Sequence, residues 1–313
     1  MESPEMERER TPERRVVPRT ITPLSTPAYH GGLRFPLKAS EIQKLVRSAL
    51  DEDQAFNDIT TIATVVSDRR ARATLVARGT GTIAGVPLAL EAFRLLDAKG
   101  TIRVEREDGL RVSKGDPILF VNGHARALLG AERVALNFMQ RLSGIASHTA
   151  RFVDAIRGTQ AKILDTRKTT PGWRLLEKYA VRAGGGVNHR MDLASHVLIK
   201  DNHLAACDGD VALAVKRVRD LAPSGTEIEV ECEHPDQVRT AIDAGAHAVL
   251  LDNMSLDELR ESVNIARGRA KTEASGGVRL DSVRAIAETG VDWISVGALT
   301  HSPPALDLAL DFE

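Results

Sequence analysis

Five side chains that are cationic, or can become so, gather in three short segments of the chain. Residues 165–172 read Asp-Thr-Arg-Lys-Thr-Thr-Pro-Gly, residues 188–190 read Asn-His-Arg shortly after three glycines, and Lys200 directly follows the apolar run 197–199. The five are Arg167, Lys168, His189, Arg190 and Lys200. Because unpaired charge is costly to bury, such a cluster needs a dense anionic partner. The pattern therefore predicts a site for a small polyanionic molecule.

The elements that must hold these segments repeat beyond residue 160, within the predicted catalytic domain, residues 131–313. Short apolar runs alternate with stretches of helical periodicity, and each run ends in polar residues or glycine. The runs span residues 163–164, 197–199, 228–230, 248–251 and 293–296, with a weaker one at 271–274. Buried strands alternating with helices predict a parallel sheet, and polar strand ends are typical of the open end of a (β/α) barrel. With six or seven strands, the pattern fits an incomplete barrel as well as a full one.

Two glycine-containing loops follow the last two predicted strands. They are Ser275-Gly276-Gly277 and Val296-Gly297-Ala298. Loops in this position of a barrel commonly bind phosphate through backbone N–H groups, and glycine lets the backbone approach the ligand closely. A tight turn explains a lone Gly-Gly pair equally often, but the two loops together favour a phosphate site.

Residues 34–130 are organised differently and predict a small α+β domain. Residues 37–50 have the spacing of an amphipathic helix, and residues 70–123 read as short strands broken by glycines, with one helix at 88–98. Residues 126–156 favour a long helical stretch, in which two helices could meet near Ser143 and Gly144. Residues 1–33 are rich in Glu, Arg, Pro, Thr and Ser, and we expect a disordered extension there.

The composition argues against several classes of function. The 313 residues carry a formal net charge of −1 and only 4% are aromatic, which does not favour nucleic acid as a partner. No apolar run is long enough to cross a membrane, and the first residues lack the apolar segment of a secretory signal. Cys207 and Cys232 have no metal-binding or redox spacing. A cytoplasmic protein with reduced thiols, bound to neither nucleic acid nor membrane, is the simplest expectation.

An ordered set of motifs closely resembles the quinolinate phosphoribosyltransferase family, the carboxylating nicotinate-nucleotide pyrophosphorylases. The resemblance begins near residue 37 and runs to the C-terminus. It rests on residues 131–133, 143–146, 165–169, 184–190, 199–203, 229–231, 250–253, 275–277 and 296–300. No single motif is decisive, but their order along the chain is highly specific.

The resemblance implies an α/β fold, with an N-terminal α+β domain (residues 34–130) packed on an incomplete seven-stranded barrel (residues 131–313). It also implies a homo-oligomer, at least a homodimer, whose active sites are shared at the subunit interface. The implied reaction joins quinolinate to phosphoribosyl pyrophosphate with Mg²⁺ present. Its products are nicotinate mononucleotide, pyrophosphate and carbon dioxide, a step of de novo NAD biosynthesis.

The cationic cluster agrees with this chemistry, because the two carboxylates of quinolinate suit cationic partners. By the resemblance, quinolinate binds to Arg133, Thr166, Arg167, His189, Arg190 and Lys200, with Arg133 reaching in from the neighbouring subunit. Taken alone, Arg133 would more often be a solvated helix residue, and His189 a satisfied buried histidine. Lys178 and Arg182 are expected to be ordinary exposed helix charges.

The predicted catalytic residues are Lys168, Glu231 and Asp252, and these three also bind phosphoribosyl pyrophosphate together with the two glycine loops. Two carboxylates in a cationic pocket suit Mg²⁺, held directly or through water, or the positive charge that develops on the ribose. Simple pairing with nearby Lys or Arg is the alternative. Glu231 is preferred to Glu229, which is expected to point into the opposite environment because successive strand side chains alternate. Lys168 is expected to protonate the ring carbon after decarboxylation.

Three other functions are compatible with parts of the pattern. A related pyrophosphorylase for a different base would keep Glu231, Asp252 and the phosphate loops but lose some carboxylate-binding cations. A Schiff-base aldolase would use Lys200 or Lys168 as its nucleophile, which borohydride trapping would reveal. A non-catalytic sensor would bind phosphoribosyl pyrophosphate without turnover.

Overall fold

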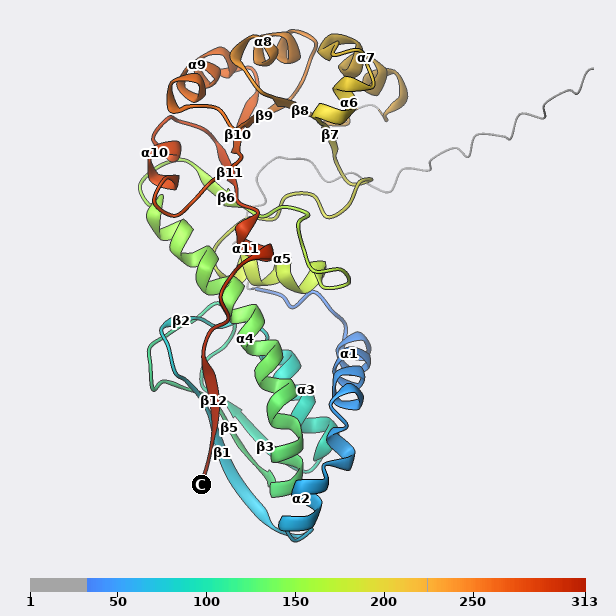
Figure 1. Ribbon diagram of the computed structural model, residues 1–313, viewed down its shortest axis with the longest axis vertical. Helices are drawn as coiled ribbons and strands as arrows, with labels where there is room; N and C mark the ends of the chain where they lie inside the picture. The colour runs from blue at the N-terminus through green and yellow to red at the C-terminus, as the bar shows by residue number, and fades with distance from the viewer. Residues whose placement is uncertain (1–32, 224) are drawn as a thin grey trace, which may run out of the picture.

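The computed structural model describes residues 33–223 and 225–313, so the expected disordered extension, residues 1–33, lies outside the described residues apart from Leu33. An antiparallel sheet occupies one end of the molecule and a parallel sheet the other, and the helix α4 (Ala125–Ala155) runs between them (Figure 1). The predicted α/β fold with a small α+β unit beside a partial barrel is thereby confirmed, although the parallel sheet has six strands among the described residues where seven were expected. The expected division between residues 130 and 131 falls inside α4.

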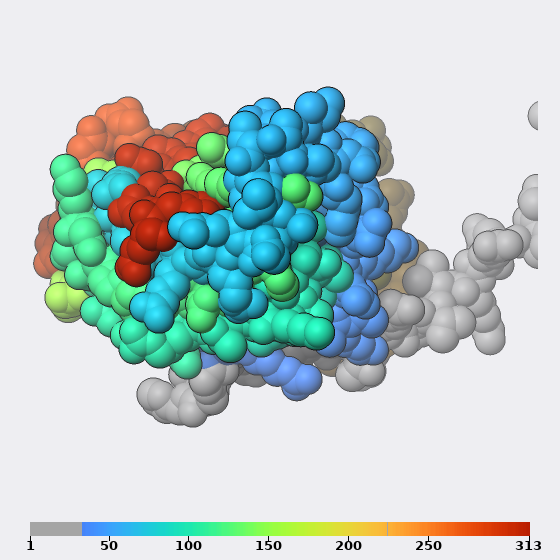
Figure 2. All heavy atoms as spheres, turned by 90° about the horizontal axis from the view of Figure 1, so that it is seen from below, coloured from blue at the N-terminus to red at the C-terminus, as the bar shows by residue number. Residues whose placement is uncertain are grey.

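The antiparallel sheet has the strand order β12-β1-β5-β3. Its strands are β1 (Arg70–Ala77), β3 (Thr101–Val104), β5 (Pro117–His124) and β12 (Leu308–Phe312). The helices α1 (Ala39–Glu52) and α3 (Val86–Leu96) pack on each other, and α3 packs on α4. Four short elements complete this part: η1 (Ala55–Asn57), α2 (Ile59–Thr64), β2 (Gly81–Thr82) and β4 (Arg111–Val112). Seen from below, the C-terminal residues lie on the surface among N-terminal segments (Figure 2).

A single continuous helix, α4, occupies the stretch in which two helices could have met near Ser143 and Gly144, so that expectation is wrong. The small residues there serve close packing instead. The Ser143 hydroxyl donates to the carbonyl of Ala84 (3.2 Å) and accepts from its N–H (3.0 Å). A Cβ on Gly144 would lie 2.3 Å from the carbonyl oxygen of Pro304, so only glycine lets the returning chain pass this close.

The parallel sheet forms the partial barrel. Its strands are β6 (Lys162–Leu164), β7 (Val197–Ile199), β8 (Ile228–Cys232), β9 (Ala248–Asp252), β10 (Lys271–Ser275) and β11 (Trp293–Ser295), in the order β6-β11-β10-β9-β8-β7. Val187 adds one isolated parallel bridge to Leu164, on the outer side of β6. All neighbours run parallel, so the carboxyl ends of the strands share one edge of the sheet. That edge is where the predicted cations and carboxylates follow the strands.

Helices alternate with these strands as the sequence predicts. They are α5 (Arg174–Ala183), α6 (Asp201–Ala205), α7 (Val211–Leu221), α8 (Pro235–Asp243), α9 (Leu256–Ala266), α10 (Val283–Ala287) and α11 (Ala298–His301). Local caps fix several starts: Ser255 and Glu258 form a capping box before α9, and the Asp210 carboxylate accepts from the N–H of Leu213 at the start of α7. Over residues 33–223 and 225–313, no helix has the length and apolar character needed to cross a membrane.

Candidate active site

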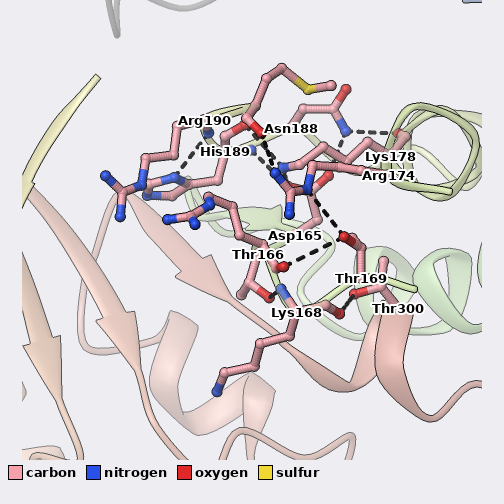
Figure 3. A network of polar contacts seen from close by, with 12 residues as sticks. Asp165, Thr166, Lys168, Thr169, Arg174, Lys178, Asn188, His189, Arg190 and Thr300 are labelled. Atoms are coloured by element: carbon pink, nitrogen blue, oxygen red, sulfur yellow. Dashed lines mark hydrogen bonds and ion pairs between the residues drawn. The ribbon is translucent and has the colours of Figure 1, made fainter. Parts of the chain in front are cut away.

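The loop after β6 carries Arg167 and Lys168, and a buried ion pair holds its start. Lys178 on α5 donates from Nζ to Oδ1 of Asp165. The other Asp165 oxygen accepts from Nδ2 of Asn188 at 2.6 Å, and Oδ1 also accepts from the N–H of His189 at 2.9 Å (Figure 3). Burial raises the pKa of Asp165, and the Lys178 ammonium and these donors oppose that rise. These contacts fix the start of the loop to the segment 188–190. The backbone that carries Arg167 and Lys168 is therefore held in place at Asp165.

Lys178 is consequently not the ordinary exposed helix charge that the sequence led us to expect. Only 1% of its side chain is exposed, and besides Asp165 it contacts the carbonyl oxygen of His189 at 3.1 Å. Arg182, four residues further along α5, is half-buried, so it too is less exposed than predicted. Helix periodicity does not reveal this burial, because residues two apart, such as Leu176 and Lys178, point to nearly opposite sides of a helix, yet both are buried here.

His189 lies in a buried group of acidic and imidazole side chains. Its Nε2 is 3.3 Å from Oε2 of Glu229 and 3.4 Å from Oε2 of Glu273, and Nε2 of His196 is 3.2 Å from the same Glu229 oxygen. Burial alone would lower the pKa of His189, but the carboxylates of Glu273 and Glu229 outweigh it and raise the pKa to about 10.

One contact disagrees with a charged His189 ring. The N–H of Arg190 points at Nδ1 of His189 from 3.0 Å, and only a ring without a proton on Nδ1 can accept it. Such a neutral hydrogen bond is worth about 1 kcal/mol, less than the attraction of the buried Glu229 carboxylate. Burial raises the pKa of Glu229, but hydrogen bonds from His189 and His196 outweigh this and lower it. We therefore assign His189 the charged form at neutral pH. Its Nε2–H then faces the carboxylates of Glu229 and Glu273.

The prediction that Glu229 points away from Glu231 is wrong. Residues two apart on a strand share a face, since side chains alternate with a period of two. Both glutamates are buried: Glu229 faces His189 and His196, whereas Glu231 reaches Lys200. Glu273, which the sequence reading missed, joins Glu229 from β10. The sequence feature that could have identified Glu273 is its position two residues before Ser275. The same spacing separates Glu229 from Glu231, so Glu273 faces the same side of the sheet as Ser275.

Nε2 of His189 and one oxygen each from Glu229 and Glu273 lie within 4.8 Å of one another, a spacing that a cation could bridge. The proton on Nε2, with a pKa of about 10, competes with any such cation at neutral pH.

Glu231 and Asp252 lie together with two of the predicted lysines. Nζ of Lys200 is 2.8 Å from Oε2 of Glu231. Burial raises the pKa of Asp252 and the neighbouring Glu231 raises it further, while Lys200 and Lys168 lower it. The structure thus brings both carboxylates and both lysines to one place at the carboxyl ends of β8 and β9.

Arg167 and Arg190 form the neighbouring part of the site. The pKa of Arg190 is lowered by burial and then by the positive charge of Arg167, so the two guanidinium groups lie close together. Nη1 of Arg190 donates to the carbonyl of His196 at 3.3 Å. Nε of Arg167 is buried and has no hydrogen-bond partner among the described residues. A buried donor left without a partner costs about 1–3 kcal/mol, which a bound anion would recover.

Thr166 and Arg133 are placed very differently. The Thr166 hydroxyl accepts from the N–H of Lys168 at 3.1 Å, so it shapes the turn. The side chain of Lys168 itself extends away from the hydrogen-bonded side chains around Asp165 (Figure 3). Arg133 is exposed on the first third of α4. It follows by three residues Gly130, whose added Cβ would meet Ala55 and Leu96 of the part that contains the antiparallel sheet. Within one chain, Arg133 therefore does not join the other predicted residues.

The two glycine loops close the same edge. Gly276 has φ +90°, and a Cβ there would lie 2.2 Å from Oδ1 of Asn253. The N–H of Asn253 donates to the carbonyl of Ser275 at 2.9 Å, which ties this loop to the end of β9. A Cβ on Gly297 would come within 3.1 Å of Cδ of Lys168, so the second loop borders the cationic segment. Val296 is buried, while Gly297 and Ala298 are partly exposed at the start of α11.

Comparisons with known proteins find relatives over most of the chain. The family models of the C-terminal and N-terminal domains of quinolinate phosphoribosyl transferase match residues 145–311 and 58–143. A probable carboxylating nicotinate-nucleotide pyrophosphorylase of Bacillus subtilis is 44% identical over 271 residues, covering 87% of this chain and 93% of that protein. The Mycobacterium leprae enzyme of that name is 46% identical, covering 85% and 95%. The nicotinate-nucleotide pyrophosphorylase structure from Francisella tularensis superposes with a TM-score of 0.83 at 40% identity, covering 90% and 99%. The chain belongs to the quinolinate phosphoribosyltransferase family.

Proposed function

We propose that the protein transfers the phosphoribosyl group of phosphoribosyl pyrophosphate to the ring nitrogen of quinolinate. The products are nicotinate mononucleotide, pyrophosphate and carbon dioxide, and the step belongs to de novo NAD biosynthesis. The observation that carries this proposal is the pair Arg167 and Arg190, one with a buried donor lacking a partner, beside Lys168 and Lys200. Two adjacent guanidinium groups match the two carboxylates of quinolinate.

In this reaction the protein mainly positions groups and balances charge. Arg167, Arg190 and Lys200 hold the pyridine ring so that its nitrogen faces the sugar carbon that carries pyrophosphate. Glu231 and Asp252 lie where positive charge develops on the ribose as pyrophosphate leaves. After the nitrogen is alkylated, the cationic ring accepts the electron pair of the departing carboxylate. Lys168, whose side chain is exposed, then delivers a proton to that ring carbon.

The donor set of Glu231 and Asp252 fits Mg²⁺. Mg²⁺ prefers one or two carboxylates together with substrate phosphate oxygens, and the pKa of Asp252 is raised partly by the proximity of Glu231, a repulsion that a cation relieves. When bound, the ion would neutralise charge on the leaving pyrophosphate. Lys200 already shares Glu231, so the two carboxylates would hold the ion in part through water.

We further propose a homo-oligomer in which Arg133 completes the site of a neighbouring subunit. Its exposure on α4, away from the barrel edge of its own chain, supports this arrangement. Mixing Arg133→Ala and Lys168→Ala subunits tests it. In a dimer with shared sites, random exchange restores about a quarter of the normal sites. If the mixture stays as inactive as each variant alone, the sites are not shared.

We also propose a cytoplasmic enzyme. Cys207 and Cys232 are both free, which is the state that a reducing compartment maintains. Fractionation of cells that produce the protein, followed by immunodetection, tests this assignment.

The activity itself is tested by incubating the protein with quinolinate, phosphoribosyl pyrophosphate and Mg²⁺ and following nicotinate mononucleotide by mass spectrometry. Nicotinate, which has one carboxylate, is the matched control substrate. We expect product from quinolinate and none from nicotinate. If neither forms product while phosphoribosyl pyrophosphate still binds, the protein is a pyrophosphorylase for another base or a sensor.

A further inference from the structure

Helix α5 carries two adjacent buried charges of opposite sign, Glu177 and Lys178, which are 0% and 1% exposed. Both side chains are directed at residues 165–170, here called the cationic loop because it contains Arg167 and Lys168. Lys178 holds the first residue of this loop, Asp165. Glu177 holds the last one, because its carboxylate accepts from the N–H of Thr170 at 3.0 Å and from the Thr170 hydroxyl at 2.9 Å.

The middle of the cationic loop is held from a third direction. The hydroxyl of Thr300, on α11, donates to the carbonyl oxygen of Lys168 at 2.8 Å (Figure 3). Arg141, on α4, donates from Nη2 both to the carbonyl of Thr300 and to Oε1 of Glu177, each at 2.6 Å. Helix α11 begins at Ala298, inside the second glycine loop. One connected network of hydrogen bonds therefore joins α4, α5, the cationic loop and the loop at residues 296–298.

Stability alone gives a poor reason for this arrangement. Buried ion pairs are often no more stabilising than well-packed apolar residues, and Glu177 makes three of its contacts with groups outside its own helix. The network instead fixes the position of the cationic loop. It leaves the side chain of Lys168 projecting from a backbone whose start, middle and end are each fixed by a hydrogen bond.

We propose that Glu177, with Arg141 and Thr300, is a positioning residue that fixes the cationic loop and couples it to the loop at residues 296–298. This inference rests on the proposed function, since it assigns the network a role in the same reaction. Displacing reacting groups by about 1 Å can cost a factor of about 100 in rate. Removal of single contacts in the network should therefore reduce turnover well before it reduces folding.

The test compares Glu177→Gln, Thr170→Val and Thr300→Val with Thr300→Ser and with the control Thr289→Val. Thr289 also donates its hydroxyl to the carbonyl three residues earlier, that of Ile286 at 2.7 Å, but lies at the opposite end of the barrel strands. Thr300 makes the equivalent contact to Gly297 at 3.3 Å, so the pair differs chiefly in the contact with Lys168. We measure kcat/KM for quinolinate, the melting temperature, and amide hydrogen exchange of the peptide covering residues 165–173.

We expect exchange of this peptide to accelerate about tenfold in Glu177→Gln and Thr170→Val. For these variants and Thr300→Val we expect kcat/KM to fall by about 10- to 100-fold, with melting temperatures close to that of Thr289→Val. Thr300→Ser, which keeps the hydroxyl, should recover most of the activity. Exchange equal to the control, or Thr300→Ser as impaired as Thr300→Val, overturns the positioning role. Faster exchange in a protein that forms no nicotinate mononucleotide overturns the proposed function, while the structural finding that Glu177 fixes the cationic loop stands.

Discussion

Nζ of Lys178 donates a hydrogen bond to Oδ1 of Asp165 in a place where the two side chains are 1% and 0% exposed. Removing one partner of a buried pair leaves an uncompensated charge and costs about 3–5 kcal/mol. Lys178→Met should therefore lower the free energy of unfolding, measured in urea, by about that amount. Asp165→Asn/Lys178→Met should recover part of the loss because it removes both charges. A double variant that is less stable than the single one would contradict this account.

Lys168 is expected to act in turnover more than in binding, because its exposed side chain projects from a loop whose backbone is fixed without it. Loss of a general acid typically costs about 10²- to 10⁴-fold in rate. Lys168→Ala should lower kcat within that range and change the quinolinate Kd, measured by calorimetry, by less than about tenfold, because Arg167, Arg190 and Lys200 remain. If binding weakens as much as turnover, Lys168 is a binding residue only.

His189 should make stability depend on pH in a defined direction. Its pKa rises from 6.5 to about 10, so the folded protein holds this proton more tightly than the unfolded chain does. The resulting stabilisation is complete below about pH 6.5 and disappears gradually as the pH rises to about 10. The difference in unfolding free energy between wild type and His189→Gln should shrink over that range. A difference that grows with pH would show that His189 is neutral in the folded state.

Gly276→Ala tests the first glycine loop. The new Cβ would lie 2.2 Å from Oδ1 and 2.8 Å from the backbone nitrogen of Asn253, so the loop must move. We expect the KM for phosphoribosyl pyrophosphate to increase by about tenfold or more. Gly158→Ala is the matched control, because Gly158 has a similar φ of +87° but no atom within 4 Å of the new Cβ. Equal effects of the two substitutions would attribute the loss to backbone strain alone.

Asp252→Asn should change the response to magnesium. If Asp252 contributes a ligand, the Mg²⁺ concentration for half-maximal rate should increase by about tenfold, the scale of one lost charged contact. Glu233→Gln, which alters an exposed carboxylate just beyond β8, should leave this concentration unchanged. An unchanged magnesium response in Asp252→Asn would mean that the carboxylate acts on the ribose instead.

The sequence predicted which segments meet, because parallel strands bring their carboxyl ends to one edge. Arg167, Lys200, Glu231 and Asp252 were all found by their position after an apolar run. The supporting charges were harder to find. Lys178 and Glu177 lie on a helix whose exposed and buried faces depend on what packs against it, and only the tertiary structure shows that α5 is covered by the cationic loop.

Glu229 was misplaced for a different reason. The alternation rule was available, but residues two apart share a face, so it should have paired Glu229 with Glu231 inside the barrel. Gly144 was misread because glycine in a helix has two meanings, a break or a close approach. The contact with Pro304, 160 residues later, decides between them, and local sequence cannot supply it.

The position of strand β12 in the chain has a consequence for folding during synthesis. It pairs with β1 over residues 308–312, so the sheet built from the earliest part of the chain keeps an open edge while the whole barrel is being synthesised. An unpaired edge strand is a template for aggregation. During translation this edge is closed only when residues 308–312 have left the ribosome, after the whole barrel, so the solubility of the first sheet depends on the folding of everything synthesised in between.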